Sequence, residues 1–247
     1  GRSFGADQSD EENGNAITEW SIFVLKIVAI NIGSLNELNY NGKSEMTGLY
    51  KQPSIRPVFL TKTGFIGDQQ ADLKHHGGMD KAVCVYSVEH YTYWQTIFPK
   101  ELPPAAFGEN LTVQNMLETE IHLGDIFQIG EAVVQVTQPR QPCYKLIWRY
   151  HMKELPVYMQ NRGYTGYYFR VLQEGQVALQ DEIVCLAYDT HRISIQFANQ
   201  IMHHDTKNME GIKKILAVDA LSDSWRTTLT KRLKGQATDT SERLQGK

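Results

Sequence analysis

The residues best suited to chemistry lie in the segment 138–145, where one cysteine follows two prolines and is flanked by two cations. Proline fixes φ and restricts the residue before it, so we expect this loop to hold Cys143 in a defined place. The positive charges of Arg140 and Lys145 favour the thiolate form of a nearby thiol. Because a thiolate is both a nucleophile and a metal ligand, we predict that Cys143 is a functional thiol.

The other two cysteines, Cys84 and Cys185, lie in apolar runs typical of β-strands, so we predict that they are small buried core residues. Three cysteines are an odd number, and no two of them form a C-x-x-C pair. This pattern argues against a disulfide framework and favours a reducing, cytoplasmic compartment. It also excludes a four-cysteine iron–sulfur cluster or zinc site within this chain.

Glycine turns with basic side chains form a second group of candidates, at 64–68 and 74–81. Glycine lets the backbone approach a ligand closely, and consecutive N–H groups in such turns can bind an anion. An ordinary turn before a strand explains the same residues equally well. His75 and His76 would also allow a zinc site completed by Cys143 and a carboxylate, although the spacing matches no familiar zinc pattern.

A third candidate segment, 106–112, combines Gly108, Glu109 and Asn110 in an otherwise apolar loop. Together these groups can form hydrogen bonds with the donors and acceptors along the edge of a heterocycle. Taken alone, a turn in which Asn110 caps the backbone is the better explanation.

The composition is that of an ordinary globular protein, since 41% of the residues are hydrophobic and 21% are charged. The net charge of −3 gives no global basic field, so we predict that the protein binds no nucleic acid polymer. The apolar stretch 20–30 is too short to span a bilayer, and no membrane association is expected. No G-x-G-x-x-G or Walker sequence occurs, which argues against a dinucleotide or P-loop module.

Residues 1–19 are acidic and poor in apolar side chains, and are expected to be a disordered tail or a remnant outside the fold. From residue 20 to 190 short apolar runs alternate with glycine-bearing turns, which favours a mainly β barrel or sandwich. The clearest signal is a hairpin that joins 126–129 to 132–137. The other predicted strands are 23–31, 57–61, 82–86, 167–172 and 183–188.

Helices are predicted at three places. Ser87 is a suitable N-cap for a helix over 88–98, and a second helical piece is expected near 145–160. After residue 191 the apolar spacing becomes helical, and Ser222 is a suitable cap for the last helix. Residues 191–247 are therefore expected to form a small three-helix domain after the β domain.

The order of these motifs resembles that of MOSC domains, a family that includes the C-terminal domain of molybdenum-cofactor sulfurases. The bacterial subgroup that confers resistance to 6-hydroxylaminopurine is the closer resemblance, because it also carries a C-terminal three-helix appendage. One departure is Leu179-Gln180-Asp181, where the family pattern has Gly-Asp before the last strand. The segments that carry the resemblance are 76–82, 107–111, 124–125 and 139–143.

The resemblance implies a MOSC-type β-barrel with helical insertions, whose loops hold a molybdopterin-type cofactor. Cys143 matches the family cysteine that ligates molybdenum, and a soft thiolate suits a high-valent metal. Asp68, Asp125 and His76 are the candidates for proton transfer. The candidate contacts of the pterin and its phosphate are His76, Gly77, Gly78, Lys81, Asn110, Arg140 and Lys145.

The activity that the resemblance implies is the reduction of N-hydroxylated compounds, including hydroxylamino purines, by a molybdenum cofactor. Because the sequence has no iron–sulfur, flavin or nicotinamide motif, we expect a separate electron-donor protein. Two alternatives stay open: a sulfur-transfer protein that carries a persulfide on Cys143, and a non-catalytic molybdopterin-binding module. The sequence is compatible with a monomer and with a homodimer.

Overall fold

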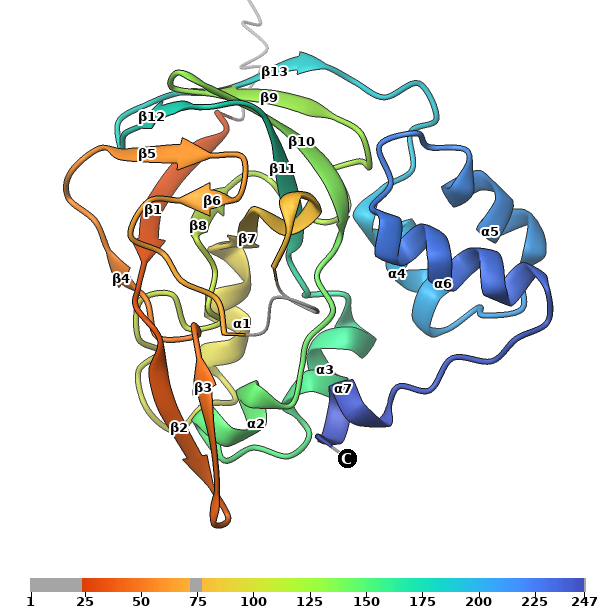
Figure 1. The fold of residues 1–247 in the computed structure, drawn as a ribbon, viewed down its shortest axis with the longest axis horizontal. Coiled ribbons are helices and arrows are strands. Elements are labelled where there is room, and N and C mark those ends of the chain that lie inside the picture. The colour runs from red at the N-terminus through yellow and green to blue at the C-terminus, as the bar shows by residue number, and fades with distance from the viewer. Residues whose placement is uncertain (1–23, 72–76, 247) are drawn as a thin grey trace, which may run out of the picture.

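The centre of the molecule is an eight-stranded sheet, seen in a computed structural model that describes residues 24–71 and 77–246 (Figure 1). Its strands run in the order β13-β9-β10-β11-β7-β8-β1-β4, and only β7 and β8 pair in parallel. An isolated bridge between Lys26 and Glu182 links its two sides, so the sheet curls into a half-barrel. The strands are β1 (Lys26–Ile32), β4 (Gln52–Pro53), β7 (Val83–Ser87), β8 (Leu111–Gln114), β9 (Ile126–Ile129), β10 (Ala132–Pro139), β11 (Tyr167–Gln173) and β13 (Ile183–Ala187).

Two smaller β elements lie beside this sheet: a three-stranded sheet in the order β12-β5-β6, and a hairpin of β2 and β3. The hairpin turns at Asn41-Gly42, where φ is 50° and 76°, values that asparagine and glycine tolerate best. This hairpin is missing from the sequence prediction because its strands are mostly polar. The strands are β2 (Asn36–Tyr40), β3 (Lys43–Thr47), β5 (Val58–Thr61), β6 (Gly64–Phe65) and β12 (Gly175–Val177).

The predicted β architecture is confirmed. Every strand predicted from residue 57 onward has a counterpart whose ends differ by no more than two residues. The strand predicted over 23–31 is β1, and residue 23 lies outside the described part of the chain. Local sequence patterns could not predict the order of the strands in the sheet, because that order depends on contacts between residues distant in sequence.

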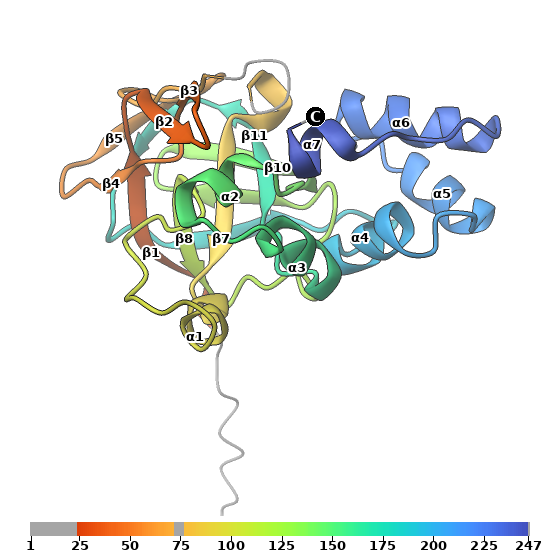
Figure 2. The ribbon, with the colours of Figure 1, turned by 90° about the horizontal axis from the view of Figure 1, so that it is seen from below.

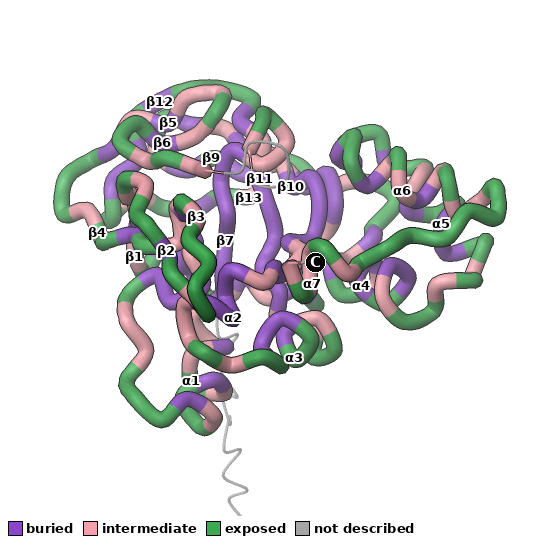
Figure 3. Tube along the Cα trace, turned by 60° about the horizontal axis from the view of Figure 1, so that its bottom comes forward, coloured by how far each residue is buried: buried purple, intermediate pink, exposed green. Residues whose placement is uncertain are grey.

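The hydrophobic core fills the inside of the half-barrel. In β10 the buried residues Ala132, Val134 and Val136 alternate with half-buried ones, as expected for a strand with one face on the core. The central strands are the most continuously buried part of the trace (Figure 3). The same cluster of buried residues continues into the C-terminal helices through Ile195 and Ile201, so these helices pack directly on the barrel.

The helices beside the barrel differ from the prediction in two ways. Ser87 is not an N-cap but the last residue of β7, and its hydroxyl donates to the Met116 carbonyl at 2.9 Å. The helix predicted over 145–160 is two helices, because His151 adopts a left-handed conformation that ends the first. The elements are α1 (Glu89–Gln95), α2 (Lys145–Tyr150), α3 (Leu155–Arg162) and a single 3-10 turn, η1 (Met79–Lys81).

Three C-terminal helices are present, as predicted, and lie to one side of the barrel (Figure 2). The Ser222 hydroxyl accepts from the Trp225 N–H at 3.3 Å, which confirms the predicted cap. A further short helix, α7, follows them, and Figure 1 shows the chain returning to the barrel to reach it. The helices are α4 (Ile195–His203), α5 (Met209–Leu216), α6 (Asp223–Leu233) and α7 (Ser241–Gln245).

Among the described residues, no helix has the length and apolar character needed to cross a membrane.

Candidate functional site around Cys143

Cys143 lies at the junction between a strand and a helix. Strand β10 ends at Pro139, and the Arg140 N–H then donates to the Gly166 carbonyl at 2.9 Å, which fixes the start of the loop. The Cys143 carbonyl accepts from the Leu146 N–H at 3.1 Å in the first turn of α2. Both ends of the loop are therefore held, and the thiol has a defined place, as the prolines predict.

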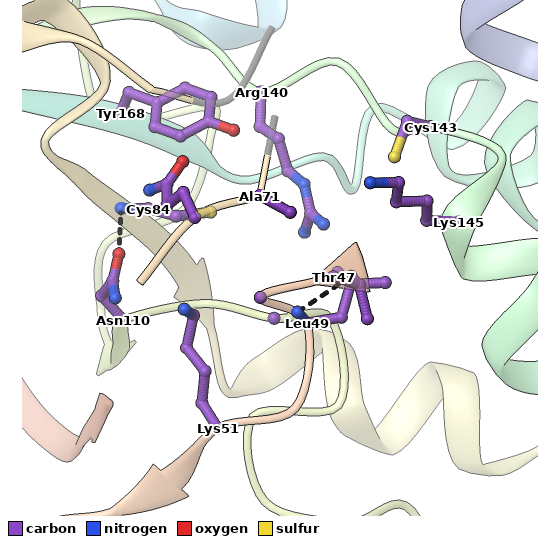
Figure 4. Close-up of a pocket in the computed structure, with 13 residues that line it drawn as sticks. Thr47, Leu49, Lys51, Ala71, Cys84, Asn110, Arg140, Cys143, Lys145 and Tyr168 are labelled. Carbon is purple, nitrogen blue, oxygen red and sulfur yellow. Dashed lines mark hydrogen bonds between the residues drawn. The ribbon is translucent and has the colours of Figure 1, made fainter. Parts of the chain in front are cut away.

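The Cys143 side chain lines a cavity of about 60 Å³, measured as space for the centres of water molecules. Figure 4 shows Arg140 and Lys145, from the two ends of the cysteine loop, and Lys51, which directly precedes β4, reaching into this space. The cavity thus combines two thiols, those of Cys143 and Cys84, with three cationic side chains. The remaining walls include Thr47, Gly48, Gly108, Asn110 and Tyr168.

The structure brings only some of the predicted site residues together. Cys143, Arg140, Lys145 and Asn110 line the same cavity, although the sequence separates Asn110 from the cysteine loop. Lys81 lines a neighbouring groove that Cys143 shares. Gly77 and Gly78 line neither, and His76 lies outside the described residues.

Asp68 lies behind the cavity wall, where its carboxylate accepts three hydrogen bonds. The donors are the Lys51 ammonium at 2.6 Å, the Asn110 amide at 2.8 Å and the Gly33 N–H at 3.1 Å. Lys51 and the Asp68 side chain are almost fully buried, so the pair holds Lys51 and Asn110 against the cavity. These contacts make Asp68 a positioning group, and its predicted role in proton transfer stays a prediction.

Both the oxygen and the NH₂ group of the Asn110 side chain form hydrogen bonds within the protein. Its oxygen accepts from the Cys84 N–H at 3.0 Å while its NH₂ group donates to Asp68. The nearby Gly108 has a φ of 76°, and a Cβ there would lie 2.6 Å from the Leu49 side chain. The segment 106–112 therefore needs glycine for close packing, and Asn110 braces the wall that it forms.

Asp125 lies away from the cavity. It directly precedes β9 and contacts the segment that connects β13 to α4. Its carboxylate accepts from the Asp189 N–H at 2.9 Å and pairs with Arg192 at 3.2 Å. Burial raises the pKa of Asp125 above its usual value, and the Asp189 N–H and the Arg192 charge oppose that rise. Asp125 lines neither the cavity nor the groove, so its contacts fit the anchoring of this connection.

The pKa of Cys143 moves in the direction opposite to the sequence expectation. Burial raises the pKa of this thiol, and the Lys145 N–H and the charges of Arg140 and Lys145 lower it by less. The neighbouring sequence reveals these charges. It does not reveal that the fold leaves Cys143 only 6% exposed. The free thiol is therefore protonated at neutral pH, and its thiolate needs a partner such as a metal ion.

Arg140 is 3% exposed, and its Nη1 atom has no hydrogen-bond partner within the described residues. A buried guanidinium nitrogen without an acceptor is costly, so such groups point to a missing anionic partner. Lys145 is better satisfied, because its ammonium donates to the Met46 carbonyl at 2.9 Å in the β2–β3 hairpin. The unpredicted hairpin thus helps to orient a predicted site residue.

Several lining residues escaped the sequence prediction. Cys84 was expected to be a structural core residue; it is buried but also lines the cavity. Lys51 and Tyr168 carry no local signal, since a single lysine in a polar stretch and a tyrosine in a strand are common. Cys185 is only half-buried, so the prediction of full burial is wrong for this cysteine.

The zinc alternative depends on His75 and His76, which lie outside the described residues. In the part of the chain that the structure covers, no three histidine, cysteine, aspartate or glutamate side chains are grouped to hold a metal. A metal held by Cys143 would thus need its other ligands from a bound group or from beyond these residues.

Comparison with protein families identifies two segments. The MOSC domain matches residues 72–184, and the YiiM-like, 3-alpha helix domain matches residues 193–236. The first segment contains the cavity residues from Cys84 to Tyr168, and the second coincides with helices α4 to α6. A protein named "Reductase" from Gibberella moniliformis is 35% identical over 144 residues, which are 57% of this chain and 26% of that protein.

Relatives of similar length cover most of the chain. YflK, an uncharacterized protein of Bacillus subtilis, is 48% identical over 206 residues, 83% of this chain and 93% of YflK. YiiM of Escherichia coli is 39% identical over 194 residues, 77% of this chain and 86% of YiiM. The crystal structure of YiiM from Geobacillus stearothermophilus superposes with a TM-score of 0.73 at 36% identity, covering 85% of this chain and 99% of that one. The chain therefore belongs to the YiiM family of MOSC-domain proteins with a C-terminal three-helix domain.

Proposed function

We propose that this protein is a molybdenum-cofactor-dependent oxidoreductase that reduces N-hydroxylated compounds such as 6-hydroxylaminopurine. The observation that carries the proposal is the buried Cys143 thiol at a cavity lined by Arg140, Lys145 and Lys51. Membership of the MOSC-domain proteins and the distant relative named a reductase support it.

The residues of the cavity fit an anionic cofactor that contains a soft metal. Within the part of the chain that the structure describes, a buried nitrogen of Arg140 has no partner, and a phosphate or another anionic group would satisfy it. Lys145 would add positive charge on a further side, and Lys51, whose charge Asp68 compensates, would add a hydrogen-bond donor. Cys143 would supply the soft thiolate ligand, and coordination would remove the proton that burial otherwise retains.

When bound, the cofactor supplies two-electron chemistry at molybdenum, by which an N–OH group becomes an amine with release of water. Overall, one N-hydroxylated molecule, two electrons and two protons yield one amine and one water. The protein's own residues would hold the cofactor: Cys143 at the metal, and Arg140 and Lys145 at its anionic groups. Asp68 would keep Lys51 and Asn110 in place through its three hydrogen bonds.

The two electrons would come from a separate electron-donor protein, because the sequence carries no motif for a second redox cofactor. The three free cysteines fit a reducing cytoplasm, which we include in the proposal. The burial of Cys143 favours a metal ligand over a persulfide carrier, since a carrier thiol must reach a partner protein.

The proposal predicts near-stoichiometric molybdenum and pterin in protein purified from a host that makes the cofactor. Cys143→Ser is expected to lose the metal, because a hydroxyl is a poor ligand for it. Cys185→Ser is the matched control, since Cys185 is half-buried and lines neither cavity nor groove. Elemental analysis and the fluorescence of oxidised pterin provide the measurement, and circular dichroism checks the fold.

Loaded protein with a chemical reductant is then expected to convert 6-hydroxylaminopurine to the amine, and Cys143→Ser is expected to lose this activity. Full activity of Cys143→Ser would contradict the assignment of Cys143 as the metal ligand. A sulfur adduct on Cys143 without metal would favour sulfur transfer, and metal without turnover would favour a binding module.

A further inference from the structure

The placement of Arg140 depends strongly on its backbone, because its buried Nη1 atom has no hydrogen-bond partner among the described residues. Its own N–H donates to the Gly166 carbonyl at 2.9 Å. This bond extends the pairing of β10 with β11 by one residue beyond Pro139 and Tyr167. The position of Gly166 therefore bears directly on where the guanidinium of Arg140 enters the cavity.

Gly166 occupies a position that suits only glycine. Its φ is 73°, in the left-handed region, and a Cβ there would lie 2.3 Å from the Val85 carbonyl oxygen. This conformation differs from the extended geometry of a strand, and β11 begins only at Tyr167. The turn at Gly166 thus depends on contacts from outside the ladder of strands.

The buried carboxylate of Glu118, in the segment that connects β8 to β9, provides the first of these contacts. Its Oε1 atom accepts from the Gly166 N–H at 2.9 Å, and its Oε2 atom lies 2.7 Å from Nε2 of His90 in α1. The His90 ring stacks on Tyr164, with the centroids 4.0 Å apart and the planes inclined by 16°. Both carboxylate oxygens are therefore engaged, and Glu118 is held against the Gly166 N–H.

The three-helix domain contacts the same turn. The Thr165 hydroxyl donates to the Gly166 carbonyl at 2.9 Å and accepts from the Asn199 amide of α4 at 3.0 Å. The Glu118 carbonyl accepts from the Gln196 N–H, also in α4, at 2.9 Å. Elements on two sides of the turn thus fix Gly166 through side chains that are buried, those of Glu118, Thr165 and Asn199.

Glu118 lies behind the site and does not line the cavity itself. A buried carboxylate is costly unless its oxygens are hydrogen-bonded, and here one of the two bonds goes to the residue that holds Arg140. The contacts thus form a chain from Glu118 through Gly166 to the backbone of Arg140.

We infer that Glu118 is a positioning residue for the anion site of Arg140. It fixes the Gly166 turn, and the turn sets the backbone of Arg140 so that the guanidinium faces a phosphate group in the cavity. The reach of the Oε1 atom, and not the charge of the carboxylate, carries the effect. The inference rests on the proposed function, because that function assigns the anion site to Arg140.

Two substitutions separate the reach of Glu118 from its charge. Glu118→Gln keeps an oxygen for the Gly166 N–H and places an NH₂ group towards His90, whose ring can accept in its other tautomer. Glu118→Asp keeps the charge but shortens the side chain by one methylene. The probe is inorganic phosphate, titrated calorimetrically into full-length, cofactor-free protein. We expect Glu118→Asp to weaken phosphate binding at least about tenfold and Glu118→Gln to change it by less than about twofold.

Ser87→Ala is the matched control for stability. Ser87 is also buried, and its hydroxyl donates to the carbonyl of Met116, two residues before Glu118 in the sequence. The variant loses a buried hydrogen bond in the same region and is expected to keep phosphate binding within about twofold. Unfolding in urea measures the stability of each variant. Equal losses of phosphate binding in Ser87→Ala and Glu118→Asp would overturn the inference, because destabilisation would explain both.

Amide hydrogen exchange tests the link to Arg140 directly. The Arg140 N–H is protected by the Gly166 carbonyl, so its exchange is expected to be at least about tenfold faster in Glu118→Asp than in Glu118→Gln. Weaker phosphate binding without faster exchange at Arg140 would overturn the inference, because Glu118 would then act by another route.

The outcome is independent of the reductase proposal. Phosphate binding that depends on the reach of Glu118 supports the inference even when protein from a cofactor-producing host contains no molybdenum, and only the reductase proposal then fails. Absence of phosphate binding in the wild type, or equal losses in Glu118→Asp and Glu118→Gln, would overturn the inference whatever the molybdenum content.

Discussion

At the scale of single residues, the candidate site depends on charges that the fold has buried. Arg140 and Cys143 are each less than 10% exposed. Burial raises the pKa of Cys143, whereas the pKa of Arg140 is raised despite burial, because nearby groups such as Cys84 and Tyr168 favour its charged form. Lys51 is comparably buried, but Asp68 compensates its charge at 2.6 Å. Because Lys51 has an ion-pair partner and the Nη1 atom of Arg140 has no hydrogen-bond partner among the described residues, Arg140 has more to gain from an anionic ligand than Lys51.

Arg140→Met tests this conclusion in the cofactor-free protein. Removal of a buried nitrogen that lacks an acceptor relieves a cost of about 1–3 kcal/mol, so we expect unchanged or higher stability in urea. The same variant is expected to lose cofactor loading. Stability that falls by several kcal/mol would show that the guanidinium is satisfied within the protein.

At the scale of elements, the turn η1 connects the barrel to the first turn of α6. The Asp80 carboxylate pairs with Arg170 of β11 at 2.8 Å and accepts from the Asp223 N–H at 3.0 Å. A carboxylate at a helix N-terminus also interacts favourably with the helix dipole. One side chain in the glycine-rich motif thus holds a strand and a helix together.

Asp80→Asn is expected to destabilise the protein by about 1 kcal/mol, because it removes the charge from both interactions. Amide hydrogen exchange should become faster in the first turn of α6. Asp223→Asn is the matched control, since it removes a carboxylate at the same helix end without the contact to Arg170. Equal effects of the two substitutions would mean that only the dipole matters.

The elements also show what the sequence could and could not reveal. Local sequence patterns were sufficient to predict the hairpin 126–137 and the Ser222 cap, because both follow from the spacing of apolar residues and from turn and capping residues. The convergence of Lys51 and Cys84 on Cys143 depends on strand order, which no local pattern contains. Burial reversed the expected pKa of Cys143 for the same reason, because the covering residues are distant in sequence.

At the scale of the whole molecule, the helices and the barrel share one apolar core and one groove. His203 lies at this junction as a neutral ring, with a pKa of about 3. In the unfolded chain its pKa is near the ordinary value of 6.5, so the unfolded state binds more protons between these values. Stability contributed by neutral His203 is therefore present above about pH 6.5 and is lost as the pH falls toward 3.

Urea unfolding at pH 7 and at pH 4.5 measures this dependence. The wild type is expected to lose about 2–3 kcal/mol more than His203→Phe between these two pH values, in line with 1.36 kcal/mol for each pH unit. His204→Phe is the control, because His204 is exposed on the same segment. An identical pH dependence in wild type and His203→Phe would contradict the assignment.

The contact between Arg243 and the cysteine loop also bears on the order of events during biosynthesis. Arg243 and Pro142 are 101 residues apart, and helices α4 to α6 are made between them. A ribosome completes the barrel strands well before it supplies the segment that carries Arg243. The hydrogen bond from Arg243 to the Pro142 carbonyl can therefore form only after the whole three-helix region has been synthesised.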